Sequence, residues 1–389
     1  MFLSKKSPLI AIDIGSSSIK LVQLRELKRG KYELAHFGIM PLTEECIVEG
    51  LIKKPELVAE ALNKLIKTEK IQSNYAVSSV AGESVFTKKI KVPVMSKEEL
   101  SKRITNNTQN YIPFDIDDVA LDFEILSTIR ADEEEGFKTT EQVNFLHDSQ
   151  DNDVQVESSD DSIKMRDFME VLLVAVKKNT INERSNILKA AGLKPVVIDL
   201  DVFALMNAVR LTKDLSSMGN VALVDLGDSF THINIIQGGA VHCALDIPIG
   251  GGYLTNVLMS KFKVPFEQIL AIKRGKFSSD ISSDIKEDEV IEAILEAHKK
   301  VLKEVKKYFE YFIILSNHQI ERVFLCGGGS MIRGIDGFFN DYLKIPVETL
   351  DPMQGIKVNP KKFNQSLINE MSSLYGVALG LATRRFDYI

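Results

Sequence analysis

Residues 9–24 read LIAIDIGSSSIKLVQL, two apolar runs that flank a short polar turn. A short apolar run bounded by turn residues is typical of a buried strand. Asp13 interrupts the first run, and Gly15 permits a tight backbone turn. The turn also supplies hydroxyl and amide donors from Ser16, Ser17 and Ser18. We therefore expect a strand–turn–strand hairpin that presents a carboxylate and several hydrogen-bond donors at its tip.

Such a tip suits the phosphates of a nucleoside triphosphate. Amides and hydroxyls can hold phosphate oxygens, Lys20 offsets their charge, and Asp13 can hold a hydrated Mg²⁺ ion. Turns of the form Asp-x-Gly with serines also occur in ordinary hairpins. The first hairpin alone therefore leaves both interpretations open.

A second copy of the same pattern favours the nucleotide interpretation. Residues 221–237 read VALVDLGDSFTHINIIQ, with Asp225 and Gly227 in the places of Asp13 and Gly15. The two aspartates are 212 positions apart, a spacing typical of two halves of a protein rather than of a short repeat. We expect the two hairpins to face each other across a cleft and to hold one phosphate chain from both sides.

The composition excludes several classes of protein. The 389 residues are 44% hydrophobic and 26% charged, as in ordinary globular proteins, and the length predicts two or three domains. The formal charge of −6, without a basic stripe, argues against nucleic acid as a partner. Three cysteines without CxxC spacing argue against disulfides and zinc. No apolar stretch approaches the ~20 residues of a membrane span, so we expect a cytoplasmic protein without direct transmembrane insertion.

The segment 131–161 differs in composition from the rest of the chain. It holds eleven acidic residues and one lysine, Lys138. Such a segment cannot bury enough apolar surface to offset the entropy lost on ordering it. We predict a flexible insertion in a loop between two strands, and the alternative is an acidic docking strip for a partner.

Hydrophobic periodicity predicts alternating strands and helices over the remainder. Strands are expected at 31–39, 75–80, 119–126, 169–178, 196–199, 240–247 and 323–325, with a loop at 40–50. Helices are expected at 55–67, 97–111, 180–191, 202–209, 253–262, 265–273, 287–315, 335–342 and 371–382.

Four elements resemble the actin-like ATPase superfamily in kind and in order. They are Asp13-x-Gly15, Asp201 after a strand, Asp225-x-Gly227-Asp228, and a glycine triplet that begins at Gly327. This resemblance implies that Asp13 and Asp225 hold Mg²⁺ through water and that Asp201 positions the attacking water. It also implies ATP contacts from Gly15, Ser16, Ser17, Ser18, Lys20, Gly227, Asp228, Ser229, Thr231, Lys273, Arg274, Gly327, Gly328 and Gly329. Asp201 could instead be the N-cap of the helix that follows it. His232, next to the turn of the second hairpin, is interpreted as a structural hydrogen-bonding residue and not as part of the site.

Within the superfamily, the chain resembles the PilM family of type IV pilus assembly. The resemblance is carried by IAIDIGSSSIKLVQL, KIKVPVMSKEEL, YIPFDIDDVALDFEIL, EVLLVAVKKNTINERSNILKAAGLKPVVIDLDVFAL and LYGVALGLATRR. It implies an α/β actin-like ATPase fold, with two ribonuclease-H-like lobes around a nucleotide cleft and an FtsA-like 1C subdomain inserted in the first lobe. The implied domains are 1–82 (first lobe), 83–178 (1C-like), 179–220 (return to the first lobe) and 221–389 (second lobe, with a smaller subdomain at about 253–320).

The same resemblance implies a function. PilM-like proteins bind ATP, with at most slow hydrolysis, and hold the N-terminal cytoplasmic peptide of a PilN-like inner-membrane protein in a groove beside the inserted subdomain. They thereby link the PilN–PilO platform to the pilus motor. The resemblance also allows contacts with the motor ATPases and self-association, at the periphery of the inner membrane. Two alternatives are an FtsA-like membrane-associated filament protein and a small-molecule kinase of the superfamily.

Overall fold

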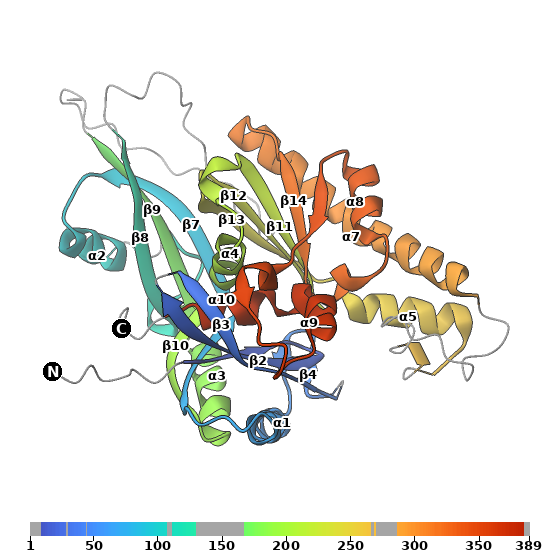
Figure 1. Cartoon of the computed structure of the whole chain (residues 1–389). Coiled ribbons are helices and arrows are strands. Elements are labelled where there is room, and N and C mark those ends of the chain that lie inside the picture. Colours follow the sequence, from blue (N-terminus) through green and yellow to red (C-terminus); the bar gives the residue numbers. More distant parts are fainter. Residues whose placement is uncertain are drawn as a thin grey trace.

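A computed structural model describes residues 9–28, 30–43, 45–106, 111–129, 167–265, 268–269 and 286–384. Two large sheets form the body of the molecule, and a third, smaller sheet lies beside them (Figure 1). The predicted acidic insertion 131–161 and most of the predicted helix 265–273 lie outside the described residues.

The first sheet has the strand order β10-β6-β1-β2-β3-β16. Its strands are β1 (Ile10–Ile14), β2 (Ser18–Lys28), β3 (Lys31–Pro41), β6 (Tyr75–Val80), β10 (Lys194–Leu200) and β16 (Ile356–Lys357). Strands β1, β2 and β3 form an antiparallel meander, whereas β6 runs parallel to β1 and β10 parallel to β6. All five residues of β1 are buried, as expected for a strand covered on both faces.

The second sheet repeats this plan with the order β13-β12-β11-β14-β15. Its strands are β11 (Asn220–Leu226), β12 (Thr231–Gln237), β13 (Ala240–Ile247), β14 (Arg322–Cys326) and β15 (Val347–Thr349). The meander β11-β12-β13 is again flanked by a strand, β14, that runs parallel to its first member. The internal repeat predicted from the two hairpins is therefore a repeat of whole sheets.

Helices cover both sheets. Helices α1 (Pro55–Thr68) and α3 (Lys178–Ala190) pack against the outer face of the first sheet. Helices α5 (Gly251–Phe262), α7 (Glu287–Ser316) and α8 (Ile335–Leu343) pack on the second. Helices α4 (Asp201–Arg210) and α10 (Gly376–Ala382) contribute to one apolar core that contains residues of both sheets (Figure 1). Each large sheet with its helices forms one lobe, and the two lobes share this apolar core instead of meeting at a polar interface.

The chain passes between the lobes twice, and the two passages lie side by side. The first leads from α4 to β11, and the second leads from β15 to β16. A Cβ atom added to Gly355 in the second passage would lie 2.7 Å from the carbonyl oxygen of Leu211 in the first. A side chain at position 355 would therefore push the two passages apart.

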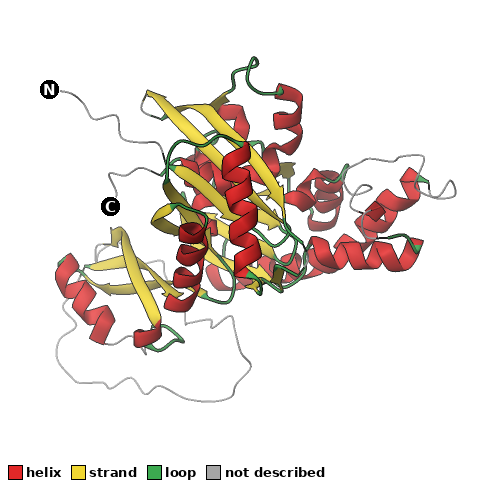
Figure 2. Ribbon diagram, turned by 90° about the horizontal axis from the view of Figure 1, so that it is seen from below, coloured by secondary structure: helices red, strands yellow, loops and turns green. Residues whose placement is uncertain are grey.

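The third sheet has the order β7-β9-β8, with all strands antiparallel. It consists of β7 (Val85–Pro93), β8 (Val119–Ile129) and β9 (Phe168–Lys177), with α2 (Lys97–Asn106) on one face. Figure 2 shows this unit projecting from the two lobes. It has a separate apolar core, to which Val92, Leu100 and Val171 belong. Helix α2 begins with a capping box, in which the Ser96 and Glu99 side chains each accept a hydrogen bond from the other's backbone amide.

Three expectations about secondary structure are wrong in detail. The loop expected at 40–50 includes strand β4 (Ile47–Val48), which pairs with β5 (Leu51–Ile52). The helix expected at 97–111 is described over Lys97–Asn106, and Tyr111, the next described residue, lies in a turn. Ile125, which alternation along the strand places on the same face as the buried Val119, is 40% exposed, and the pairing of β8 with β9 shifts by one residue directly after it.

The helix expected at 371–382 is interrupted. Helix α9 (Gln365–Met371) is followed by a 3-10 turn before α10 begins. Within this turn, the Ser373 carbonyl accepts a 2.9 Å bond from the Gly327 amide, and the Ser372 hydroxyl accepts a 3.1 Å bond from the Met353 amide. The Ser373 carbonyl is a group that a continuous helix would use in its own backbone hydrogen bonds. The 3.6-residue period of the sequence does not show that this group is engaged elsewhere.

Candidate functional site

The two hairpin tips meet. The Ser229 hydroxyl, at the tip between β11 and β12, donates to the Ser16 hydroxyl at the tip between β1 and β2, over 2.8 Å. The next residue of the second tip also reaches the first lobe, because a Cβ atom on Gly50 would lie 2.5 Å from Phe230 Cε2. Residues 213 positions apart in the chain are thus in direct contact. The two hairpins lie face to face, as the repeated pattern predicted.

Asp13 and Lys20 form an ion pair within the first hairpin. They are directly opposite each other on β1 and β2, and Lys20 Nζ lies 3.3 Å from Asp13 Oδ2. Both residues are buried. A Cβ atom on Gly15 would lie 3.0 Å from Lys20 Nζ, so the glycine leaves room for the ammonium group at the turn. The first tip therefore holds one carboxylate and one cation close to the serine donors.

Asp225, His232 and Asp246 form a row across the second sheet. Asp225 is opposite His232 on β11 and β12, and His232 is opposite Asp246 on β13. His232 Nδ1 contacts an Asp246 carboxylate oxygen. Burial raises the pKa of Asp225, and the charge on Asp13 raises it further. This effect of Asp13 is consistent with two carboxylates that lie close together across the cleft.

The pKa of His232 is raised to about 9. Burial lowers the pKa, but the charge and hydrogen bond of Asp246 outweigh burial, and Asp225 and Asp201 add to the effect. The imidazole is therefore a cation at neutral pH. The sequence left His232 outside the site as a structural residue, whereas the structure places it among the carboxylates of the cleft.

The free energy of unfolding is expected to fall at high pH because of His232. A histidine in an unfolded chain titrates near pH ~6.5, so the folded state retains a proton up to about pH 9 that the unfolded state has released. The stabilisation is complete below about pH 6.5 and falls by on the order of 2–3 kcal/mol as the pH rises to about 9. Urea denaturation between pH 6 and 9.5 measures this fall.

Two variants separate this effect from other titrations. His232→Gln should show a much smaller fall between pH 6 and 9.5 than the parent protein. His318→Gln, which changes an exposed histidine, should retain the fall. An equally steep fall in His232→Gln would contradict the assignment of the raised pKa to this residue.

Asp201 lies at the start of α4, beside the first hairpin. It is the first helical residue, and Leu200 occupies the N-cap position. The N-cap alternative is therefore wrong. Burial and the charge on Asp13 raise the pKa of Asp201 to about 6, although His232, a hydrogen bond with Ser79 and Arg184 lower it. A carboxylate that titrates near neutral pH can accept a proton from water, so the chemistry suits the expected role.

The glycine triplet after β14 closes against the second hairpin. Gly327 has φ +79°, and a Cβ atom at this position would lie 2.1 Å from Asp225 Oδ1. A Cβ atom on Gly329 would lie 2.6 Å from Leu226 Cβ, whereas one on Gly328 would meet only Leu374 at 3.6 Å. Gly327 and Gly329 are therefore required for close approach, and Gly328 makes only ordinary contacts.

A second glycine triplet supports the same hairpin from the other side. The Gly251 amide donates to Gly227 O over 2.8 Å, and the Gly252 amide donates to Asp228 O over 2.9 Å. A Cβ atom on Gly250 would lie 2.4 Å from the Asp228 carbonyl oxygen. The sequence shows this triplet plainly, but not that it packs against the phosphate hairpin.

Other expected site residues lie as follows. The Thr231 hydroxyl donates its proton to Ile249 O over 2.8 Å, which leaves only acceptor lone pairs, and an anionic phosphate needs donors. In this structure the Thr231 hydroxyl therefore holds the loop, and its contact with a phosphate stays a prediction. Lys273 and Arg274 lie outside the described residues.

Within the described part of the chain, no group of three or more histidine, cysteine, aspartate or glutamate side chains forms a metal site.

A pair of carboxylates is nonetheless enough for Mg²⁺. This ion usually retains several waters and is held by one or two carboxylates together with substrate phosphates. Asp13 and Asp225 fit that pattern. Arg184 of α3, which the sequence did not single out, reaches the same region and donates from Nη1 to Ile14 O over 3.2 Å.

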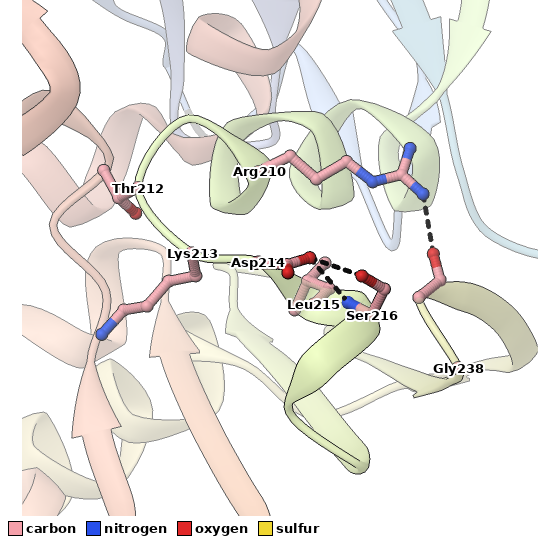
Figure 3. A pocket seen from close by; sticks show the side chains of 8 residues that line it. Arg210, Thr212, Lys213, Asp214, Leu215, Ser216 and Gly238 are labelled. Carbon is pink, nitrogen blue, oxygen red and sulfur yellow. Dashed lines mark hydrogen bonds between the residues drawn. The ribbon is translucent and has the colours of Figure 1, made fainter.

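A wider surface hollow lies away from these residues. It has a volume of about 490 Å³ and is lined by Arg210, Lys213, Asp214 and neighbouring residues (Figure 3). Arg210 Nη2 donates to Gly239 O over 2.7 Å, and Asp214 accepts a bond from the Ser216 amide over 3.2 Å. Its polar groups are thus largely engaged with one another.

The family described as Type IV pilus assembly protein PilM matches residues 11–138 and 151–386. The chain belongs to the PilM family. Residues 139–150, which the match leaves out, lie within the acidic segment. The PilM assignment made from the sequence motifs is therefore confirmed, and with it a place in type IV pilus assembly.

Solved structures with the same fold support this assignment. A structure described as a PilM–PilN type IV pilus biogenesis complex has a TM-score of 0.75 and 22% identity, and the match covers 97% of this chain and 98% of that one. The ethanolamine utilization protein EutJ from Carboxydothermus hydrogenoformans has a TM-score of 0.54 and 15% identity, covering 97% and 89%. The predicted actin-like α/β fold is confirmed.

No helix among the residues described here is long and apolar enough to cross a bilayer.

Proposed function

We propose that this PilM-family chain binds ATP with Mg²⁺ between its two lobes and, in that state, holds the cytoplasmic tail of a PilN-like inner-membrane protein. The observation that carries the nucleotide part is the contact between the two hairpin tips, through Ser229 and Ser16. The partner is suggested by family membership and by the similar fold found in a PilM–PilN complex.

The charges of the cleft suit a magnesium nucleotide. Asp13 and Asp225 come from opposite lobes. The charge on Asp13 raises the pKa of Asp225 and also that of Asp201. A divalent cation between them would relieve this repulsion, and the ion's remaining positions would go to water and phosphate oxygens. Lys20, now paired with Asp13, would then be free to face a phosphate.

The glycines hold the second hairpin in place beside the proposed nucleotide site. Gly327 lies against Asp225, and Gly250 lies against Asp228. A side chain at either glycine would displace the hairpin that carries the Mg²⁺ carboxylate. Within the superfamily resemblance, Gly327–Gly329 is the adenosine side and Asp228 the phosphate side.

Nucleotide and partner are coupled if the ligand holds the lobes together. ATP that touches both hairpins favours the closed arrangement by its difference in affinity for the closed and open states. The inserted unit is attached to the first lobe, because β9 leads directly into α3. We place the PilN-like tail beside this unit, so that the chain joins the membrane platform to the motor at the inner membrane and acts by binding, with hydrolysis slow at most.

Titration of a fluorescent peptide tests this function. The cytoplasmic tail of the PilN-like protein from the same organism is titrated with the full chain, with and without Mg-ATP, and fluorescence anisotropy reports binding. A coupling of ~1–3 kcal/mol predicts about 5-fold or more tighter binding with Mg-ATP. A peptide with the same residues in scrambled order is the control.

Two outcomes would contradict the proposal. Absence of tail binding under both conditions would remove the assigned partner. Equal affinity with and without Mg-ATP, in a protein that calorimetry shows to bind ATP, would leave an adaptor that holds its partner constantly and would overturn the coupling.

A further inference from the structure

Arg184 is a partly buried cation next to the first hairpin. It lies in the middle of α3, and its Nη1 donates to the carbonyl oxygen of Ile14, the residue directly before Gly15. Burial lowers the pKa of the guanidinium, whereas the charges on Asp201 and Asp13 raise it. The guanidinium therefore lies between the first phosphate hairpin and the carboxylate at the start of α4.

The hydrogen-bonding capacity of this side chain is largely unused. Arg184 Nε is buried and has no hydrogen-bond partner among the described residues. Within the same part of the chain, Arg184 forms no ion pair with a carboxylate, unlike Lys20, which lies 3.3 Å from Asp13, and Arg384, which lies 2.6 Å from Asp199. A buried donor without a partner costs free energy, more so when it is charged, so an anionic ligand would satisfy a group that the protein itself does not.

A purely structural role explains only part of this arrangement. One N–H group suffices to bind the Ile14 carbonyl, as Arg210 shows by donating from Nη2 to Gly239 O over 2.7 Å. Arg210, however, is exposed, whereas Arg184 is mostly enclosed and close to two carboxylates of the cleft. Guanidinium groups hold phosphate oxygens with paired, planar donors, which an ammonium cannot do.

We propose that Arg184 contacts the terminal phosphate of a bound nucleoside triphosphate and so distinguishes ATP from ADP. This inference rests on the proposed nucleotide site and adds a specificity residue to it. The terminal phosphate is chosen because the guanidinium binds the backbone of the first hairpin directly before Gly15 and lies within the electrostatic influence of Asp201, the residue expected to position the attacking water. Arg184 and Lys20 would then neutralise the phosphate chain from two directions.

Calorimetry with Mg-ATP and Mg-ADP on the full chain tests this role. A charge-assisted hydrogen bond predicts that Arg184→Gln binds Mg-ATP about 10-fold to 100-fold more weakly, with Mg-ADP affinity changed less than about 3-fold. Arg184→Lys retains the charge without the planar donors and should fall between the parent and Arg184→Gln. Arg210→Gln, the matched arginine bound to a backbone carbonyl, should bind both nucleotides as the parent does.

The outcomes separate this inference from the proposed function. Equal loss for ATP and ADP, or no loss for either, would overturn the role of Arg184 while a parent protein that binds Mg-ATP retains the proposed function. A parent protein that binds no nucleotide would overturn both. If Arg184→Gln does not fold, as judged by its melting curve, Arg184→Lys decides: an ATP-selective loss supports the inference and unchanged affinities overturn it.

Discussion

Asp225→Asn is expected to weaken Mg-ATP binding by at least about 10-fold, equivalent to ~1.4 kcal/mol or more. The substitution keeps the shape of the side chain but removes the negative charge that would hold the water shell of Mg²⁺ on the second lobe. Folding should be little affected, because burial raises the pKa of Asp225 by more than the attraction of His232 lowers it, so the folded state does not favour the charged form of this carboxyl on balance. Calorimetry gives the affinity, and thermal melting without nucleotide gives the stability.

Two further variants make the result specific. Asp13→Asn should weaken Mg-ATP binding similarly but also lose the ion pair with Lys20, so that its melting temperature falls as well. Asp214→Asn removes an exposed carboxylate that caps the turn at Ser216 and should leave ATP affinity unchanged. Normal ATP affinity in both the Asp225 and the Asp13 variants would place the nucleotide elsewhere.

Gly380→Ala is expected to destabilise the protein by roughly 3 kcal/mol or more. Gly380 lies in α10, and a Cβ atom there would be 1.6 Å from the carbonyl oxygen of Ala204 in α4. The obstacle is backbone, which cannot rotate away as a side chain can, so the two helices must separate. The gain of about 1 kcal/mol from replacing glycine by alanine in a helix is too small to offset this.

Gly337→Ala is the matched control for this substitution. Gly337 is also helical, in α8, but no atom lies within 4 Å of the position of its Cβ. Its replacement should raise the free energy of unfolding by about 0.5–1 kcal/mol. Urea denaturation followed by circular dichroism measures both variants. A shift of the same sign and size in the two proteins would show that helix propensity, and not the contact with Ala204, determines the result.

The sequence predicts those parts of the site whose residues are close together along the chain. Each phosphate hairpin is a single run of residues, so the carboxylates Asp13 and Asp225 and their turns could be recognised without any tertiary information. The repetition of the pattern then predicted that the hairpins face each other, which the bond between Ser16 and Ser229 bears out. The actin-like fold and the PilM family follow from the same stretches.

The parts that the sequence did not predict depend on contacts between distant segments. The charge of His232 requires Asp246, which becomes its neighbour only through the register of β12 and β13. Arg184 reaches Ile14 from a helix 170 positions away. The interruption of the predicted helix 371–382 arises from hydrogen bonds to Gly327 and Met353. Periodicity and motif spacing contain no information about such pairs.

The side-by-side passages between the lobes have a mechanical consequence. Two covalent links that touch, with Gly355 against Leu211, form a hinge that restricts the motion of one lobe relative to the other. Rotation about the line through both links stretches neither, whereas torsion across that line would pull on one and compress the other. Opening and closing of the hairpin tips is thus the soft motion of this molecule. A ligand that contacts both hairpin tips, which already meet through Ser16 and Ser229, acts along that single coordinate.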